Sequence, residues 1–325
     1  MKKFTVGLIG FGYWGKILLK YLTNNEGFRL KSIAVRNPKK IESAVPAGVK
    51  LCTVGEIASD SEIDAVFIAT PIKSHFELVK LFLKHGKHIF CEKPLTEKYS
   101  EALELKNLAE NSGLTLFTDY IYTFSPSLKK MTELALSGEI GTIRSVVFNI
   151  RQLGHFSENN VYMDLGCHCL ALLDTIAPLH LSENPAQKIP GKWVFSRRDI
   201  MSGDNITETG EIDFELIETK DESIKGSMFL SFNHPWKNRN ITIYGNKGSI
   251  TYDMIKDPPL QMEKYSVNRM ISRDPEKRQA SGFNFDESNN IAFTVEHFHK
   301  ILTGEAESNT EQAVRVTRIL EKILG

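Results

Sequence analysis

The sequence predicts a two-part protein of the α/β class: a parallel sheet with alternating helices over residues 1–122, then an α+β domain with an open antiparallel sheet over residues 123–325. Three observations support this division. At 325 residues the chain exceeds one ordinary hydrophobic core, so about two domains are expected. The first part alternates short apolar runs with helical periodicity, as βαβ units do. The apolar runs after residue 205 instead follow one another around turns, as in antiparallel sheets.

The expected strands of the first part are short apolar runs that end at glycine, proline or charged residues. We place them at 4–9, 30–35, 49–54, 63–69, 87–90 and 114–118, with the main helices at 16–22, 75–85 and 97–112. In the second part we expect helices at 128–136 and 162–176 and strands at 143–150, 211–219, 226–233, 240–244 and 249–253. Residues 177–205 and 254–284 are predicted to be mainly loops, the former with room for one strand. Two closing helices are expected at 289–302 and 310–324, and the last is expected to pack back on the first part.

Composition excludes several classes of partner. With 40 basic and 40 acidic side chains the formal net charge is zero, so no bulk electrostatic attraction to nucleic acid or anionic membranes is expected. Four cysteines are too few for a disulfide framework in a chain of this size, which favours a reducing, cytoplasmic compartment. The apolar run after the first lysines is broken by glycines, so a strand fits it better than a signal peptide. No run of 18 apolar residues could span a membrane. A small molecule is the expected partner.

A glycine fingerprint follows the first expected strand and opens the first helix. The segment Gly10-Phe11-Gly12-Tyr13-Trp14-Gly15 has the form G-x-G-x-x-G. Its first glycine permits a tight turn, its second lets a pyrophosphate approach the backbone, and its third lets helix and strand pack closely. The helix N-terminus adds unpaired N–H groups and the positive end of its dipole. A glycine-rich turn without a ligand is the alternative, and the strand-turn-helix context favours a dinucleotide site.

The residues at the end of the second strand indicate which dinucleotide the protein binds. NAD-binding folds usually have Asp or Glu here to bind the ribose 2′-hydroxyl. This chain has Arg36 followed by Lys39 and Lys40. A guanidinium pairs with a 2′-phosphate, which a carboxylate would repel. The sequence therefore favours NADP over NAD, although an exposed Arg36 could also stack on the adenine of either cofactor.

Further candidates lie beyond the carboxyl ends of the fourth and fifth expected strands, 63–69 and 87–90. Thr70 and Pro71 follow the strand at 63–69 and are expected to contact the cofactor together with His75, for which helix capping or packing is the alternative. Glu92 and Lys93 end the next strand, because the following proline cannot donate to a strand ladder. A lysine at this position points into the crevice where parallel sheets bind ligands. A plain surface lysine is the alternative.

These motifs resemble the Gfo/Idh/MocA (glucose–fructose oxidoreductase / inositol dehydrogenase) family. The matching segments are residues 10–15, 64–71, His75 and 86–95, in the family's order. The resemblance implies a Rossmann domain, a substrate domain with an open sheet, NAD(P)-dependent oxidoreductase activity, and a homodimer or homotetramer formed through that sheet. Segments 231–239 and 243–250 more narrowly resemble members that act on sugar nucleotides and amino sugars.

Another group of candidate catalytic residues lies in the segment Tyr162-Met-Asp164-Leu-Gly-Cys-His168. Residues four apart on a helix share a face, so Asp164 can orient the His168 imidazole. A packing histidine is the alternative. The resemblance implies that this segment faces substrate beside Lys93, and we count Arg151 and Tyr162 among the expected substrate contacts. Many relatives carry an acid where this chain has Ala171, which leaves finer substrate contacts open.

No metal is predicted. Cys167 and Cys169 flank His168, but C-x-C is not the usual zinc spacing and their side chains would diverge on a helix. Packing roles fit them better.

The expected reaction is reversible hydride transfer between a nicotinamide and a secondary alcohol or ketone of a sugar-like substrate lying between the two parts. His168 is the candidate general acid/base, Lys93 would stabilise charge on the reacting oxygen, and Asp164 would hold the imidazole. Which of Lys93 and His168 moves the proton stays open. A free polyol or inositol is the alternative substrate. The resemblance also allows NAD-dependent glycosidases or epimerases and non-catalytic dinucleotide-binding regulators.

Overall fold

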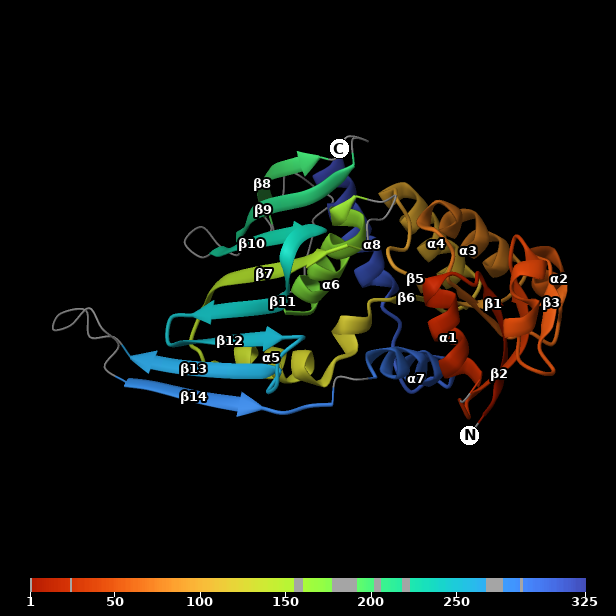
Figure 1. The fold of residues 1–325 in the computed structure, drawn as a ribbon, viewed down its shortest axis with the longest axis horizontal. Coiled ribbons are helices and arrows are strands. Elements are labelled where there is room, and N and C mark those ends of the chain that lie inside the picture. The colour runs from red at the N-terminus through yellow and green to blue at the C-terminus, as the bar shows by residue number, and fades with distance from the viewer. Residues whose placement is uncertain are drawn as a thin grey trace. The chain divides into compact units, whose positions relative to one another are not determined.

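The computed structural model describes residues 2–23, 25–154, 160–176, 192–201, 206–217, 223–266, 277–286 and 289–325. The chain separates into two compact units (Figure 1). The first unit comprises residues 1–121, 289–323 and 325, and the second comprises residues 122–288 and 324.

The first unit is built on a six-stranded parallel sheet in the order β3-β2-β1-β4-β5-β6. All six strands predicted from the sequence are present, with ends that differ by a few residues. They are β1 (Phe4–Ile9), β2 (Phe28–Ala34), β3 (Lys50–Cys52), β4 (Ala65–Ile68), β5 (His88–Glu92) and β6 (Leu116–Asp119). The helices among them are α1 (Tyr13–Thr23), α2 (Val54–Ser59), α3 (His75–Lys84) and α4 (Tyr99–Asn111). The strand order reverses beside β1, and ligands of such sheets bind at the carboxyl ends of the strands near this point.

Both closing helices, α7 (Asn290–Leu302) and α8 (Thr310–Leu324), group with the first unit apart from residue 324. The sequence analysis assigned residues 123–325 to the second domain and let only the last helix pack back. The buried ring of Phe298 on α7 explains the difference, because it lies 5.5–6.0 Å from four core rings of the parallel sheet. Before α8, the Asn309 amide donates to Thr118 O at 2.7 Å and accepts from Thr118 N at 2.9 Å.

The second unit is built on an eight-stranded sheet in the order β14-β13-β12-β11-β7-β10-β9-β8. The strands are β7 (Ile143–Leu153), β8 (Lys192–Met201), β9 (Thr207–Ile217), β10 (Ser223–Ser231), β11 (Asn233–Gly245), β12 (Gly248–Asp253), β13 (Leu260–Ser266) and β14 (Lys277–Phe283). The predicted antiparallel sheet needs one correction, since β10 runs parallel to β7 and the sheet is mixed. The chain inserts helical segments and the β8–β9 hairpin between these two strands, so β10 returns in the direction of β7. The loop predicted over 254–284 is also wrong, because β13 and β14 pair within it.

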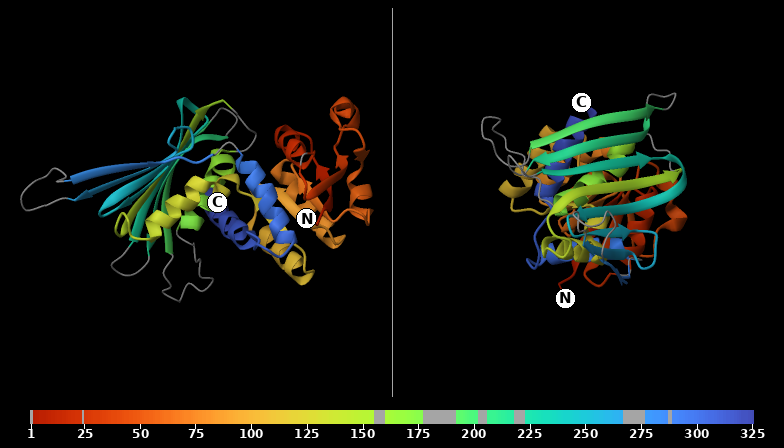
Figure 2. Two further views of the ribbon diagram at one scale, coloured as in Figure 1. Left: turned by 90° about the horizontal axis from the view of Figure 1, so that it is seen from below. Right: turned by 90° about the vertical axis from the view of Figure 1, so that its left-hand side faces the viewer.

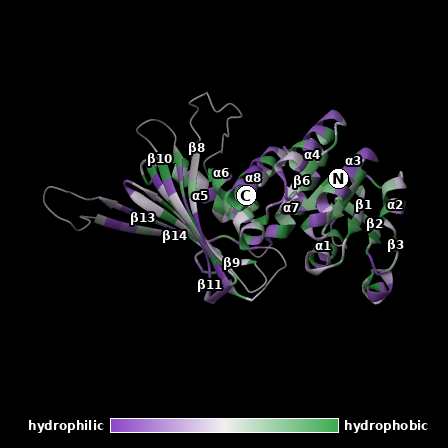
Figure 3. Ribbon diagram, turned by 90° about the horizontal axis from the view of Figure 1, so that it is seen from above, coloured by the Kyte–Doolittle hydropathy of each residue, from purple (hydrophilic) through white to green (hydrophobic). Residues whose placement is uncertain are grey.

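Helices α5 (Pro126–Leu136) and α6 (Cys167–Ile176) lie on the same face of this sheet (Figure 2). Along β7, Val146, Phe148 and Ile150 are buried, while the residues between them are partly exposed. Figure 3 shows hydrophilic and hydrophobic residues interspersed along the strands of this unit. The alternation has period two, so neighbouring residues of a strand point to opposite faces. We call the side that carries Val146 the helix face and the other the open face.

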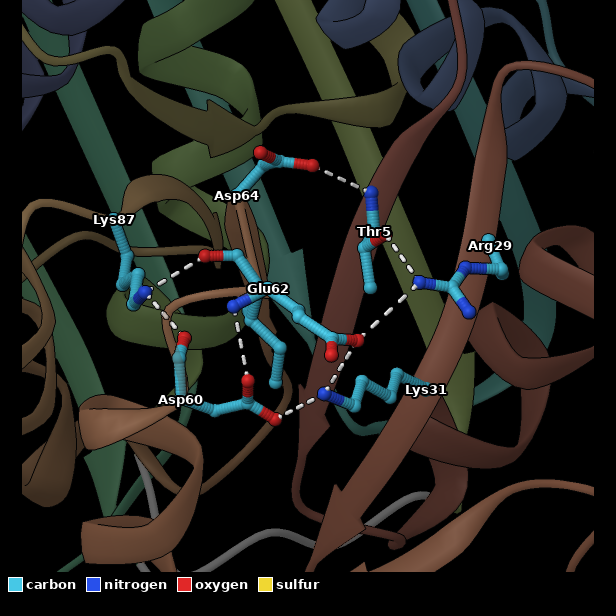
Figure 4. Close-up of polar contacts among 8 residues, drawn as sticks. Thr5, Arg29, Lys31, Asp60, Glu62, Asp64 and Lys87 are labelled. Carbon is cyan, nitrogen blue, oxygen red and sulfur yellow. Dashed lines mark hydrogen bonds and ion pairs between the residues drawn. The ribbon is translucent and has the colours of Figure 1, made fainter.

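A polar network closes the amino ends of the parallel strands (Figure 4). The buried Lys87 ammonium donates to Asp60 O and Ile63 O, both at 2.7 Å, and burial lowers its pKa. Asp64 accepts from the Thr5 N–H at 2.7 Å, which joins the starts of β1 and β4. The amino ends of the strands are therefore occupied by structural contacts, and the candidate site lies at the carboxyl ends.

Candidate functional site

The three glycines in the turn between β1 and α1 have different roles. Gly10 has φ 97°, and a Cβ there would lie 2.5 Å from Ala69 O. A Cβ at Gly15 would lie 2.4 Å from Gly10 O. A Cβ at Gly12 would meet no protein atom within 4 Å. Packing within the protein therefore requires glycine at the first and third positions. At Gly12 no protein atom requires it, and only a ligand lying close to the backbone would exclude a side chain there. These residues fit a dinucleotide pyrophosphate.

The neighbouring strands end around this turn. Gly10 N–H donates to Ala34 O at 2.9 Å, and Ala69 N–H donates to Ile9 O at 2.8 Å. Arg36 lies two residues beyond the end of β2 and is exposed, as are Lys39 and Lys40. The structure thus places the predicted basic group in the loop that follows β2, beyond the carboxyl end of the strand next to the glycine turn.

Side chains of the motif itself differ in exposure. Tyr13, the first residue of α1, is 67% exposed, and its ring meets the Trp14 ring edge-on at 5.4 Å. Phe11 and Trp14 are partly exposed. Their contact with a cofactor stays a prediction.

His75 links the loops that follow β4 and β5. Its Nε2 lies 2.9 Å from Thr70 O and its Nδ1 lies 3.0 Å from Pro94 O. Two carbonyl acceptors favour a doubly protonated ring, but nearly complete burial lowers the pKa of His75 and is the larger effect. The neutral ring then donates to one carbonyl at a time. His75 is therefore buried between these two loops, while Thr70 is partly exposed and Pro71 is exposed at the carboxyl ends of the strands.

Three charged residues meet at the carboxyl ends of β5 and β6. Glu92 is in register with Asp119, so both side chains start on the same face of the sheet. Both are buried, and Lys93 is partly exposed. Burial raises the pKa of Asp119 to about 7, while Thr294 and the Lys93 charge act in the opposite direction. Asp119 was not predicted as a site residue, although a carboxyl on the last residue of a buried strand was an available signal.

In the second unit, residues Tyr162–Gly166 form a π-helical turn that continues into α6. The predicted uniform helix is corrected here, because Cys167 N–H donates to Tyr162 O five residues back. Asp164 lies in this turn and His168 in the first turn of α6, so they still occupy successive turns. Such π turns are frequent at functional sites. The ring of His168, which is 9% exposed, meets the ring of Tyr122 edge-on at 4.9 Å.

Arg239 extends this group on the helix face. It lies on β11 opposite Ile150 of β7, so it points to the same face as that buried residue. Its guanidinium donates to the Tyr122 hydroxyl and, at 2.6 Å, to Gln152 Oε1. Its charge also lowers the pKa of Cys169, a smaller effect than the burial that raises it. Tyr122, Gln152 and Arg239 were missed from the sequence, although Arg239 ends the 231–239 segment that carried part of the resemblance.

Arg151 and Tyr162, by contrast, are engaged elsewhere. Arg151 lies next to Gln152 and so points to the open face, away from the helices. There its guanidinium stacks 4.8 Å from the Phe229 ring centre and lies 3.1 Å from His234 Nε2. Buried Tyr162 donates to Asp199 on β8 at 2.5 Å. The structure therefore does not bring Arg151 to His168.

Two arginines of β8 form ion pairs within the second unit. Arg197 pairs with Asp199 at 3.0 Å and Arg198 pairs with Glu211 at 3.2 Å. The side chain of Trp193 lies outside the described part of the chain. Among the residues that the structure describes, no three His, Cys, Asp or Glu side chains gather as a metal-ligand set. No described helix has the length and apolar content needed to cross a membrane.

Comparison with known proteins gives a family match for the first unit. Residues 4–120 match the Gfo/Idh/MocA model, described as an oxidoreductase family with an NAD-binding Rossmann fold. An uncharacterized oxidoreductase of Bacillus subtilis is 24% identical over 265 residues, which cover 78% of this chain and 74% of that protein. Inositol 2-dehydrogenase of Rhizobium meliloti is 30% identical over 146 residues, 45% of this chain and 44% of that protein. That second match spans less than half of the relative.

A solved structure resembles the chain over nearly its whole length. The 3-ketoreductase KijD10 of Actinomadura kijaniata, in complex with TDP-benzene and NADP, has a TM-score of 0.80, with 98% of this chain and 96% of that chain covered. The two sequences are 17% identical, so this likeness supports the fold alone. Together the comparisons indicate a nicotinamide cofactor without deciding between NAD and NADP.

Proposed function

We propose that the protein is an oxidoreductase of the Gfo/Idh/MocA family, whose NAD-binding Rossmann-fold model its residues 4–120 match. The protein acts on CH–OH groups, transferring a hydride between NAD(P) and a secondary alcohol or ketone of a sugar or sugar-nucleotide derivative. The observation that carries the proposal is the glycine turn, in which Gly12 leaves the backbone approachable while Gly10 and Gly15 are fixed by packing. Lys93 lies at the same edge of the sheet, at the end of β5.

The proposed chemistry assigns one role to each candidate side chain. A bound nicotinamide supplies the hydride acceptor or donor. Lys93 donates a hydrogen bond to the reacting oxygen and stabilises the negative charge that develops there. His168 removes or returns the hydroxyl proton, because an imidazole titrates near neutral pH. Asp164 orients the imidazole, and the Tyr122 ring holds it from the side.

Arg36 supports NADP as the preferred cofactor. The guanidinium is exposed beyond β2, beside the glycine turn, and Lys39 and Lys40 add positive charge nearby. A ribose 2′-phosphate is the group that this arrangement would bind. NADPH-dependent reduction is the direction that follows.

A polyol or inositol dehydrogenase is the second candidate function. The 30% identity to inositol 2-dehydrogenase favours it, although that match covers less than half of the relative. Both candidates share the residues assigned above and differ in substrate.

We also propose that the protein forms a homodimer or homotetramer through the open face of the eight-stranded sheet. No described helix of the second unit covers that face, whereas α5 and α6 cover the other (Figure 2). Sedimentation of the purified protein tests this, and a monomer at micromolar concentration would contradict it.

Turnover of sugar substrates tests the function. Keto-sugars, sugar nucleotides and free polyols are mixed with each reduced or oxidised cofactor, and the absorbance of reduced nicotinamide is followed. We expect Lys93→Met and His168→Gln each to lower kcat by about 10²–10⁴-fold while the cofactor Kd stays within about 2-fold. Lys98→Met, at a lysine with a 66% exposed side chain, is the matched control. Wild-type turnover in Lys93→Met would remove that residue from the mechanism.

A further inference from the structure

Arg239 is a partly buried cation with neutral partners. Among the described residues, its two side-chain hydrogen bonds go to the Tyr122 hydroxyl and to the Gln152 amide oxygen, neither of which is an anionic group. In the described part of the chain, no ion pair within 4.0 Å includes Arg239. Its Nε is buried without an acceptor among these residues. The guanidinium thus keeps a positive charge that its described neighbours do not balance.

Two carboxylates on other strands of the second unit are paired with other groups. Asp253, at the end of the neighbouring strand β12, pairs with Lys256 at 3.3 Å. Asp199 accepts from Tyr162 and pairs with Arg197. A charge removed from water without a counter-charge is unfavourable, and hydrogen bonds to neutral groups compensate it only in part. An anion would restore the balance, because charge-assisted hydrogen bonds are about twice as strong as neutral ones.

The position of Arg239 connects this charge to the proposed chemistry. The Tyr122 hydroxyl accepts from Arg239, and the ring of the same tyrosine meets the His168 imidazole at 4.9 Å. A guanidinium has five N–H donors, of which two are used here, and its planar fork matches carboxylate and phosphate oxygens. An anion held at Arg239 would therefore lie one aromatic ring away from the candidate acid/base.

We propose that Arg239 binds an anionic group of the substrate, a carboxylate or a phosphate carried by the sugar-like ring. This inference rests on the proposed function and narrows its substrate class to acidic or phosphorylated sugar derivatives. Arg239 binds and orients the substrate, and Gln152 and Tyr122 hold the guanidinium in place.

The test uses binding, so that it does not depend on turnover. Glucose, glucuronate and glucose 1-phosphate are titrated by calorimetry into the full chain with NADPH present and absent. Inorganic phosphate and acetate are titrated in parallel, while the Arg239 Nε–H resonance is followed by NMR after its assignment with Arg239→Gln. Arg239→Lys keeps the cation, and Arg198→Gln removes an arginine whose side chain is 72% exposed.

We expect phosphate or acetate to shift the Arg239 resonance saturably. At least one charged sugar should bind about 10-fold or more tightly than glucose, as one charge-assisted hydrogen bond allows. The preference should vanish in Arg239→Gln, persist in part in Arg239→Lys and be unchanged in Arg198→Gln. A preference for glucuronate assigns a carboxylate, and one for glucose 1-phosphate assigns a phosphate. An unmoved resonance, or a preference that survives Arg239→Gln, overturns the inference. Anion binding at Arg239 without any hydride transfer would instead contradict the proposed function.

Discussion

Replacing Asp119 by asparagine should change how stability depends on pH. Burial raises the pKa of this carboxyl from 3.8 to about 7. Between these values the folded chain binds more protons than the unfolded chain, so the stability of the wild type falls as pH rises. Each pH unit between the two pKa values lowers the unfolding free energy by about 1.4 kcal/mol. From about pH 5 to about pH 7 the wild type therefore loses about 3 kcal/mol of unfolding free energy. Asparagine has the same shape and no such dependence.

Urea unfolding at about pH 5 and about pH 8 measures this loss. The difference in unfolding free energy, Asp119→Asn minus wild type, should increase by about 3 kcal/mol between the two conditions. Asp213→Asn, which removes a carboxylate with a 58% exposed side chain, is the matched control and should show no comparable change. In Lys93→Met the pH range over which this stability is lost should move to higher pH, because the Lys93 charge holds the pKa of Asp119 down. A constant difference between wild type and Asp119→Asn would refute the reasoning.

Two further pairs of substitutions test the packing argument. Gly12→Ala should unfold with a free energy within about 1 kcal/mol of wild type but bind dinucleotide about 10-fold or more weakly. Gly15→Ala should lose about 3 kcal/mol of unfolding free energy, because its Cβ would clash with Gly10 O. Equal stability of the two variants in thermal unfolding would contradict this distinction. Phe298→Ala should destabilise the first unit by about 3–5 kcal/mol, because its ring packs against four others, while Ile255→Ala at an exposed position should cost less than about 0.5 kcal/mol in urea unfolding. Similar losses for both would show that α7 is not part of that core.

The first unit was predictable because its signals are local. Each strand is an apolar run closed by a turn residue, and the glycine turn combines a positive φ at Gly10 with a close backbone approach at Gly15. Both requirements are met by residue type within a few positions of the chain. The place of α7 was not predictable in the same way, because an apolar helix face shows that a partner exists without showing which one. Phe298 meets rings more than 180 residues earlier in the chain.

The substrate side was predicted less well. The Asp164–His168 segment was found by its spacing, but the sequence alone did not show the π turn that begins it. Arg151 was expected near His168 and lies on the open face. The alternation of buried Val146, Phe148 and Ile150 contained this information, since odd-numbered residues of β7 must then point the other way. Arg239 was out of reach, because its role depends on two partners, Tyr122 and Gln152, that are distant in sequence.

Equilibrium binding of NADPH and NADH to the wild type and to Arg36→Ala tests the central claim most directly. Fluorescence titration should show that the wild type prefers NADPH by about 10-fold or more, as one arginine–phosphate pair would provide. Arg36→Ala should lose this preference and keep its affinity for NADH, and Gly12→Ala should weaken the binding of both. Equal or tighter binding of NADH to the wild type would contradict the role given to Arg36 and turn the search toward NAD-dependent oxidation of polyols. Binding of neither dinucleotide would contradict the proposed function itself.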